Sequence, residues 1–346
     1  DSAFTLFYLC FNIGAAIGVF FGGEIGEKLG FGLAFNLGAI ATAVSFIVLF
    51  IFKKLIKEAN GRSINGTKNC SSLQSYLSIF LISLAGIPIS IFLFNHLEIN
   101  NYLMLVLLFF MVGLILLKIR SFEDKKTRRK LLAFLFLTLI SVVFWILYSL
   151  EPSFISVFIS TNVNQNFLGI NIPAESFYTF NCLFIILIGL VLNRVWRFLS
   201  LKNQNPSLIF KFITALIIVG LGFMYVAWQI THYKTTLMPA YHLVIAYAIF
   251  STAELLVGPL GIGMVGNLAP ESMEGILMGF WELIIGVAGV LASFIAQIPR
   301  FPTVNVTLLS SNLIYFKVFL FIGLSAVVTG VLLFPIASKV KALMTK

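Results

Sequence analysis

The chain has 346 residues, of which 60% are hydrophobic and 10% charged, and its mean hydropathy is +1.03. A soluble domain carries about 25% charged residues, so this composition excludes a protein with a water-solvated surface. The formal net charge is +10, but the Lys and Arg residues stand between long apolar segments instead of clustering on one face, which argues against nucleic-acid binding.

Ten apolar segments are long enough to cross about 30 Å of hydrocarbon, which takes about 20 residues of helix. In chain order they cover residues 3–22, 30–52, 73–94, 101–119, 131–150, 174–198, 208–230, 240–265, 275–297 and 313–338. The sequence therefore predicts an all-α membrane protein with about ten transmembrane helices. Some segments are interrupted by Pro88, by Pro259, and by the glycines Gly258, Gly261 and Gly263. Such interruptions are tolerated where neighbouring helices or a water-filled cavity satisfy the freed backbone groups.

The basic residues predict how the helices are oriented. The links 53–68, 118–130 and 194–211 and the tail 339–346 hold 19 of the 23 Lys and Arg residues. By the positive-inside rule we expect these links and both chain ends in the cytoplasm. The basic cluster at 125–130 is expected to contact anionic lipids of the bilayer.

The sequence shows none of the motifs of common enzymes. No Ser/His/Asp arrangement, phosphate-binding loop, dinucleotide-binding turn or metal-spaced cluster is recognisable, so we expect neither catalysis nor a cofactor. The three cysteines have no metal-ligand spacing. His96, His232 and His242 fall in or near the links opposite to the basic ones, and we expect them to be solvated.

Two acidic residues lie inside apolar segments. Glu254 stands in the middle of the segment 240–265, and Glu282 stands within the segment 275–297. A carboxylate at the bilayer centre costs several kcal/mol, so it must face a cavity, pair with another group or hold a proton. Each outcome suits a proton-coupled or cation-binding site, and a structural Glu that joins two helices is the alternative.

Other polar and aromatic residues in the segments have two interpretations each. Tyr8 and Asn12 are four residues apart and share one helix face, where they would bind a polar ligand or join two helices. For Asn181, a hydrogen bond between helices is the commoner role. Trp145 and Trp281 would line a pocket, or pack in the bundle or at the membrane interface.

Several short motifs resemble those of the proton-dependent oligopeptide transporter (POT/PTR) family of the major facilitator superfamily. The matching runs are FTLFYLCFNIG at 4–14, FWILY at 144–148, IPAESFYTFN at 172–181, AELLVGPLG at 253–261, LAP at 268–270 and GILMGFW at 275–281. They are similar to the family's fifth, seventh, eighth, tenth and eleventh helices. The order and spacing agree over nearly the whole chain.

The resemblance implies a fold and its domains. The family has a twelve-helix bundle, and its bacterial members carry two further helices between the halves. Residues 1–53 would be the last two helices of the N-terminal bundle, 54–128 a cytoplasmic link with the inserted pair, and 129–346 the C-terminal six-helix bundle. The family's first four helices are expected to be missing, and the inserted pair implies a bacterial inner membrane.

The resemblance also implies a function, the symport of di- and tripeptides with protons by alternating access. The substrate-binding residues that it implies are Tyr8, Asn12, Trp145, Asn181, Glu254 and Trp281. Tyr8 and Asn12 would contact the peptide backbone or carboxylate. Asn181 and Glu254 would receive the amino terminus, and the two tryptophans would form the walls of side-chain pockets.

The chain departs from the family pattern at some positions that matter for proton chemistry. Ser149 stands where the family has an acid four residues after the helix-seven Trp, and Glu151 is the nearest acid. Gly258 replaces a Ser, and Cys182 replaces a Pro. Glu282 stands at an ordinarily apolar position, and our hypothesis is that it partly replaces the lost carboxylate.

The candidates for proton coupling are therefore Glu254, Glu282 and Glu151. Two alternatives to peptide symport stay open. The chain would be a divergent member that carries another small solute, or a truncated remnant that does not transport.

Overall fold

Helices make up nearly all of the computed structural model, which describes residues 2–53, 72–297 and 307–345. Within these ranges ten helical segments are long and apolar enough to cross a membrane, as the sequence predicts. The α-helices are α1 (Ser2–Leu29), α2 (Phe31–Ile51), α4 (Ser72–Asn95), α5 (Leu97–Ser121), α6 (Lys125–Ser149), α7 (Ser156–Asn162), α8 (Thr179–Leu201), α9 (Leu208–Ile230), α10 (Tyr241–Glu254), α11 (Gly258–Leu268), α12 (Glu274–Ala296), α13 (Leu308–Leu333) and α14 (Ala337–Thr345).

Short 3₁₀-helical or π-helical turns extend several of these α-helices. A π-helical turn, η1 (Glu151–Ile155), joins α6 to α7, and 3₁₀ turns precede α8 (η2, Ala174–Tyr178) and α12 (η3, Glu271–Met273). Another 3₁₀ turn, η4 (Phe334–Ile336), joins α13 to α14. Such turns often mark functional places in a helix.

The eighth span is broken in its middle. It ends as α10 at Glu254 and restarts as α11 at Gly258, where Pro259 occupies one of the first positions. Pro has no N–H to donate, so it fits the start of a new helix, where that bond is not needed. Pro88, by contrast, stays inside the continuous helix α4. Across the break the chain stays buried, and the N–H groups of Leu256 and Val257 donate to the carbonyls of Ala253 and Glu254.

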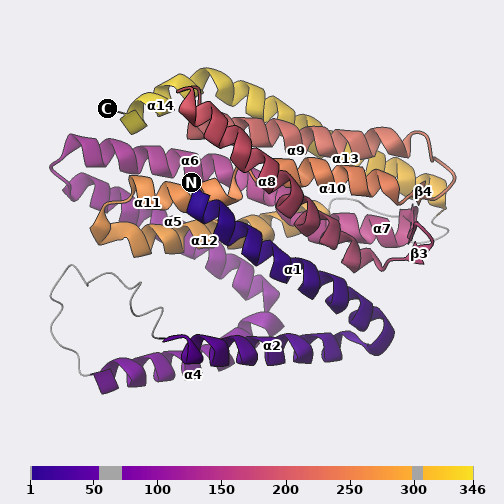
Figure 1. Ribbon diagram of the computed structural model, residues 1–346, viewed down its shortest axis with the longest axis horizontal. Coiled ribbons are helices and arrows are strands. Elements are labelled where there is room, and N and C mark those ends of the chain that lie inside the picture. The colour runs from indigo at the N-terminus through magenta and orange to yellow at the C-terminus, as the bar shows by residue number, and fades with distance from the viewer. Residues whose placement is uncertain (1, 54–71, 298–306, 346) are drawn as a thin grey trace.

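α9 lies in one of the most buried spans of the bundle and packs against α13 and α10. Figure 1 shows α9 between α13 and α10, running along both. Glycines bring α9 and α13 together, because a Cβ added at Gly220 would lie 2.7 Å from the carbonyl oxygen of Gly323. Small residues of this kind let membrane helices approach closely. On the outside, α1 packs against α8, η2 and α11.

Replacing Gly220 by Ala is expected to destabilise the bundle. The new methyl group would also lie 2.9 Å from Cβ of Ala326, so α9 and α13 must move apart, at a cost of about 1–3 kcal/mol. Thermal unfolding in detergent measures the effect. Gly113→Ala in α5 is the matched control, because no atom lies within 4 Å of its added Cβ. Equal melting temperatures for the two variants would contradict the packing argument.

The remaining regular structure is two pairs of very short strands. β1 (Val163–Asn164) pairs in parallel with β4 (Met238–Pro239), with Val163 opposite Met238. β2 (Asn166–Phe167) and β3 (Ile170–Asn171) form an antiparallel hairpin. Its turn residues Leu168 and Gly169 both have positive φ, 55° and 85°, as a tight hairpin turn requires. These links close one end of the bundle.

The exposed surface matches a protein in lipid. α2 has no buried residue although it is almost wholly apolar, and the spanning part of α4 is likewise unburied. The prediction for one histidine was wrong: His242 is 8% exposed. Its Nδ1 lies 3.1 Å from the Tyr225 hydroxyl and its Nε2 3.2 Å from that of Tyr233, because α10 starts inside the closed end of the bundle.

Candidate functional site

The buried carboxylate of Glu254 is the centre of the candidate site. It lies at the last residue of α10, next to the break, and is 1% exposed. The Tyr8 hydroxyl, from α1, donates a hydrogen bond to its Oε1. The Asn181 amide, from the first turn of α8, donates to its Oε2 over 3.1 Å. Glu254 therefore joins three helices.

A second acid lies on the other side of Asn181. Glu151, the first residue of η1, is also 1% exposed, and its Oε2 lies 3.4 Å from Nδ2 of Asn181. Throughout the described ranges, no Lys, Arg or His nitrogen lies within 4 Å of either carboxylate. Two buried carboxylates without a cation repel each other when both are ionised. This pair is suited to hold a proton or to attract a positively charged ligand.

Tyrosines complete the polar cluster, and sequence reasoning did not select them. The hydroxyls of Tyr148 and Tyr178 are hydrogen-bonded to each other, and the rings of Tyr178 and Tyr247 lie 6.3 Å apart. The Tyr247 hydroxyl and the Asn181 Oδ1 are buried without a hydrogen-bond partner among the described residues. The signal for Tyr148 was its place three residues after Trp145, which puts both on one helix face.

A cavity of about 400 Å³ opens beside this cluster, within the size range of small-molecule sites. Its lining includes Phe7, Tyr8, Phe11, Trp145, Tyr148, Gly258, Ile262, Trp281, Glu282 and Ile285. The rings of Trp145 and Trp281 meet edge to face, 6.2 Å apart. Glu254 does not line the cavity, because the Tyr8 hydroxyl covers it.

The structure brings together most of the residues that the sequence singled out, but not all. Asn12 is buried on the face of Tyr8, yet its amide donates to the Tyr8 carbonyl over 2.9 Å and does not reach the cavity. Glu282 is exposed on the cavity wall. The Ser149 hydroxyl donates to the carbonyl of Trp145, 2.8 Å away. It is Glu151, and not Ser149, that contacts Asn181 in the Glu254 cluster.

Residues 1–312 match the model of a protein family described as the POT family. The chain belongs to the POT family. Dipeptide and tripeptide permease B of Yersinia enterocolitica is 26% identical over 96% of the chain and 67% of the permease. The permease B of Salmonella typhimurium is 27% identical over 94% of the chain and 66% of that protein. The chain thus spans about two thirds of the length of these relatives.

Solved structures of the POT family have the same fold. A peptide transporter POT in complex with sulfate aligns with a TM-score of 0.76, at 22% identity, over 100% of the chain and 69% of the transporter. A POT family transporter in complex with a thioalcohol-conjugated peptide aligns with a TM-score of 0.75 at 20% identity, over 100% and 70% of the two chains. The fold is that of the major facilitator superfamily, as predicted.

Gly258, at a position where the resemblance implies a Ser, leaves room for Tyr8. A Cβ added at Gly258 would lie 2.6 Å from the Tyr8 hydroxyl oxygen. We expect Gly258→Ser to push Tyr8 away from Glu254 and to lower the stability by about 1–3 kcal/mol. The loss should shrink in part in a Tyr8→Phe background, because Phe removes the hydroxyl contact but keeps ring carbon Cζ, which lies 2.9 Å from the added Cβ.

Thermal unfolding of the two single variants and the double variant checks this coupling. Gly266→Ser in the same helix is the control, since its added Cβ meets no atom within 4 Å. If the stability losses of Gly258→Ser and Tyr8→Phe simply add in the double variant, the small size of Gly258 is not required by contact with the Tyr8 hydroxyl.

Proposed function

We propose that the chain is a secondary active transporter that carries di- and tripeptides together with protons by alternating access. One observation carries the proposal: the carboxylate of Glu254, buried at a helix break, is held by Tyr8 and Asn181 beside an aromatic cavity. The names of the permeases that the chain resembles support the substrate class.

The amino terminus of the peptide is the group that fits Glu254. A primary ammonium has three N–H donors, and Glu254 with the unpartnered Asn181 Oδ1 offers acceptors for them. In the structure the Tyr8 hydroxyl donates a hydrogen bond to the Glu254 carboxylate. The peptide ammonium would take the place of this hydroxyl, and Tyr8 would then be free to form a hydrogen bond with the peptide. Charge makes the ammonium the stronger donor of the two.

The cavity favours a small ligand with apolar side chains. Trp145, Trp281, Phe7 and Phe11 supply aromatic walls, and these accept side chains of many shapes through contact area alone. Among the described residues that line the cavity, Glu282 alone is charged. The peptide carboxylate therefore needs a cation from residues that do not line this cavity. An amine without a carboxylate would need no such cation.

Protons would be carried by the cluster of Glu151, Asn181 and Glu254. The Asn181 amide contacts both carboxylates, so a change in the charge of one alters the hydrogen bonding of the other. When the ammonium binds Glu254, a negative charge there is stabilised, and the proton of the pair is left to Glu151. The break between α10 and α11 is where the bundle would bend.

We also propose the topology that the basic links imply, with both ends of the chain in the cytoplasm and the chain in a bacterial inner membrane. The division into 1–53, 54–128 and 129–346 belongs to the same proposal. Cysteine accessibility in the basic link 118–130 tests the orientation. A cysteine in this link that is labelled from outside intact cells would show that the orientation is the opposite of the proposed one.

Uptake of a labelled dipeptide into proteoliposomes under an inward proton gradient tests the function. We expect accumulation that stops when the gradient is collapsed, and competition by unlabelled di- and tripeptides. An amine of similar size that has no carboxylate is the comparison ligand. If the amine competes and peptides do not, the chain carries another small solute; if nothing is accumulated under either condition, the proposal fails.

A further inference from the structure

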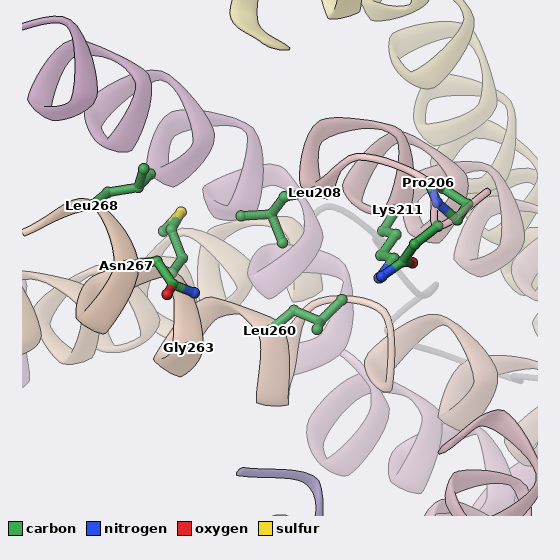
Figure 2. A pocket seen from close by; sticks show the side chains of 9 residues that line it. Pro206, Leu208, Lys211, Leu260, Gly263, Asn267 and Leu268 are labelled. Carbon is green, nitrogen blue, oxygen red and sulfur yellow. The ribbon is translucent and has the colours of Figure 1, made fainter. Parts of the chain in front are cut away.

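A second cavity, separate from the candidate site, lies at the start of α9. It has a volume of about 190 Å³ and shares no lining residue with the aromatic cavity. Its walls are Asn205, Pro206, Leu208, Lys211, Leu260, Gly263, Met264, Asn267 and Leu268. Figure 2 shows Lys211 and Pro206 on one side of this space and Asn267 and Leu268 on the other, with Leu208 and Leu260 between them.

Lys211 borders this cavity as a buried cation without an anion. The residue is 5% exposed, and its Nζ lies 4.1 Å from the centre of the Trp196 ring. Within the described part of the chain, no carboxylate oxygen lies within 4 Å of it. An ammonium that is buried unpaired is costly, and a cation–π contact offsets only part of that cost. The site therefore attracts an anion.

The helix start adds a second, independent attraction. Ser207 precedes α9 but makes no capping hydrogen bond, and its hydroxyl is buried without a partner among the described residues. The N–H groups in the first turn of a helix have no acceptor within the helix, and the helix dipole makes this end partly positive. Such an end binds phosphate groups well, and α9 is 23 residues long.

The other walls indicate the source of the anion. Most are apolar and none is acidic, which suits the glycerol and upper acyl chain of a lipid better than a fully hydrated ion. Figure 1 shows α11 and α14 at the same end of the bundle as the turn between α5 and α6. That turn belongs to the basic link 118–130, and basic pockets between membrane helices bind lipid head groups.

We propose that the cavity between the start of α9 and α11 binds a phosphate group, presented by the head group of an anionic lipid. Lys211 supplies the charge, the first turn of α9 supplies N–H donors, and Asn267 supplies an amide from the opposite wall. The lipid would tie α9 to α11, the part of the broken span that follows Glu254, and so bias the position of that helix.

Native mass spectrometry of the full chain with added phosphatidylglycerol or phosphatidylcholine tests the proposal. We expect one phosphatidylglycerol to bind more tightly than phosphatidylcholine, and Lys211→Gln to weaken it on the order of tenfold, as for the loss of a charge-assisted hydrogen bond. Lys211→Arg keeps the charge and should retain the lipid. Asn267→Leu, which leaves Lys211 in place, should weaken binding by a smaller factor.

Lys202→Gln is the matched control. Lys202 lies in the same link and also stands over a ring, 4.2 Å from the centre of Phe198, but it is exposed and does not line the cavity. Thermal shifts with inorganic phosphate distinguish the source: stabilisation by phosphate that depends on Lys211 would support the site with free phosphate as its ligand. Lipid binding and phosphate stabilisation that are both unchanged in Lys211→Gln and Asn267→Leu would overturn the proposal.

Discussion

Replacing Glu254 with Gln is expected to lower proton-driven peptide uptake about 100-fold. Gln has nearly the same shape, and its single oxygen still accepts from Tyr8. Its amide nitrogen takes the place of Oε2 and can donate to Oδ1 of Asn181 once that side chain turns over, so the bundle should fold. What it lacks is the negative charge that receives the peptide ammonium. Removing one partner of a buried, hydrogen-bonded charge pair costs about 2–5 kcal/mol, and 2.8 kcal/mol corresponds to about a 100-fold loss.

Binding separates this effect from a general failure of the transporter. Dipeptide binding to the detergent-solubilised variant should weaken in parallel with uptake, because the same contact is lost in both. Glu274→Gln is the control, since Glu274 is an exposed acid at the first residue of α12 and does not line the cavity. Uptake by Glu254→Gln at the level of this control would refute the proposed role.

Glu151→Gln is expected to uncouple transport from the proton gradient. Peptide exchange without a gradient should stay within a few fold of the original rate, because Glu254 and the cavity remain. Proton-driven accumulation should fall by at least about tenfold, as for the loss of one charge-assisted contact. The measurement is counterflow against gradient-driven uptake in the same vesicles, over a range of pH.

Glu282→Gln is the matched comparison and tests the competing hypothesis. Glu282 lines the cavity but is exposed, whereas Glu151 is buried and reaches Asn181. We therefore expect Glu282→Gln to change the pH profile less than Glu151→Gln. The reverse order, with Glu282→Gln uncoupled and Glu151→Gln normal, would support the replacement of the helix-seven acid by Glu282.

Much of the fold could be predicted from the chain itself. The ten apolar segments became ten membrane-spanning helical segments, because in a bilayer each segment satisfies its own backbone hydrogen bonds and does not depend on its neighbours for that. The break before Gly258 and Pro259 was predicted from local sequence, but Pro88, which the same rule selected, lies inside the continuous helix α4. The short strand pairs could not, because two-residue strands leave no periodic pattern in a sequence.

The position of Glu151 shows why the site could be predicted only in part. On a regular helix it would point about 200° away from Ser149, the position at which the resemblance implies an acid. The regular helix ends where the π-helical turn begins at Glu151, and in the structure the Glu151 carboxylate lies 3.4 Å from the Asn181 amide. Spacing rules for α-helices do not predict the direction of a side chain in a π-helical turn.

The sequence by itself determined that Glu254 lies within a membrane span and requires a cavity, a partner or a proton, since that requirement follows from the cost of a charge in hydrocarbon. It also determined that Tyr8 and Asn12 share a face. Only the tertiary structure showed that Glu254 has partners, the hydroxyl of Tyr8 and the amide of Asn181. Spacing fixes the face of a residue on its own helix. The rotation of α1, α8 and η1 about their axes, which brings Tyr8 and Asn181 to the Glu254 carboxylate and Glu151 to Asn181, comes from packing between helices.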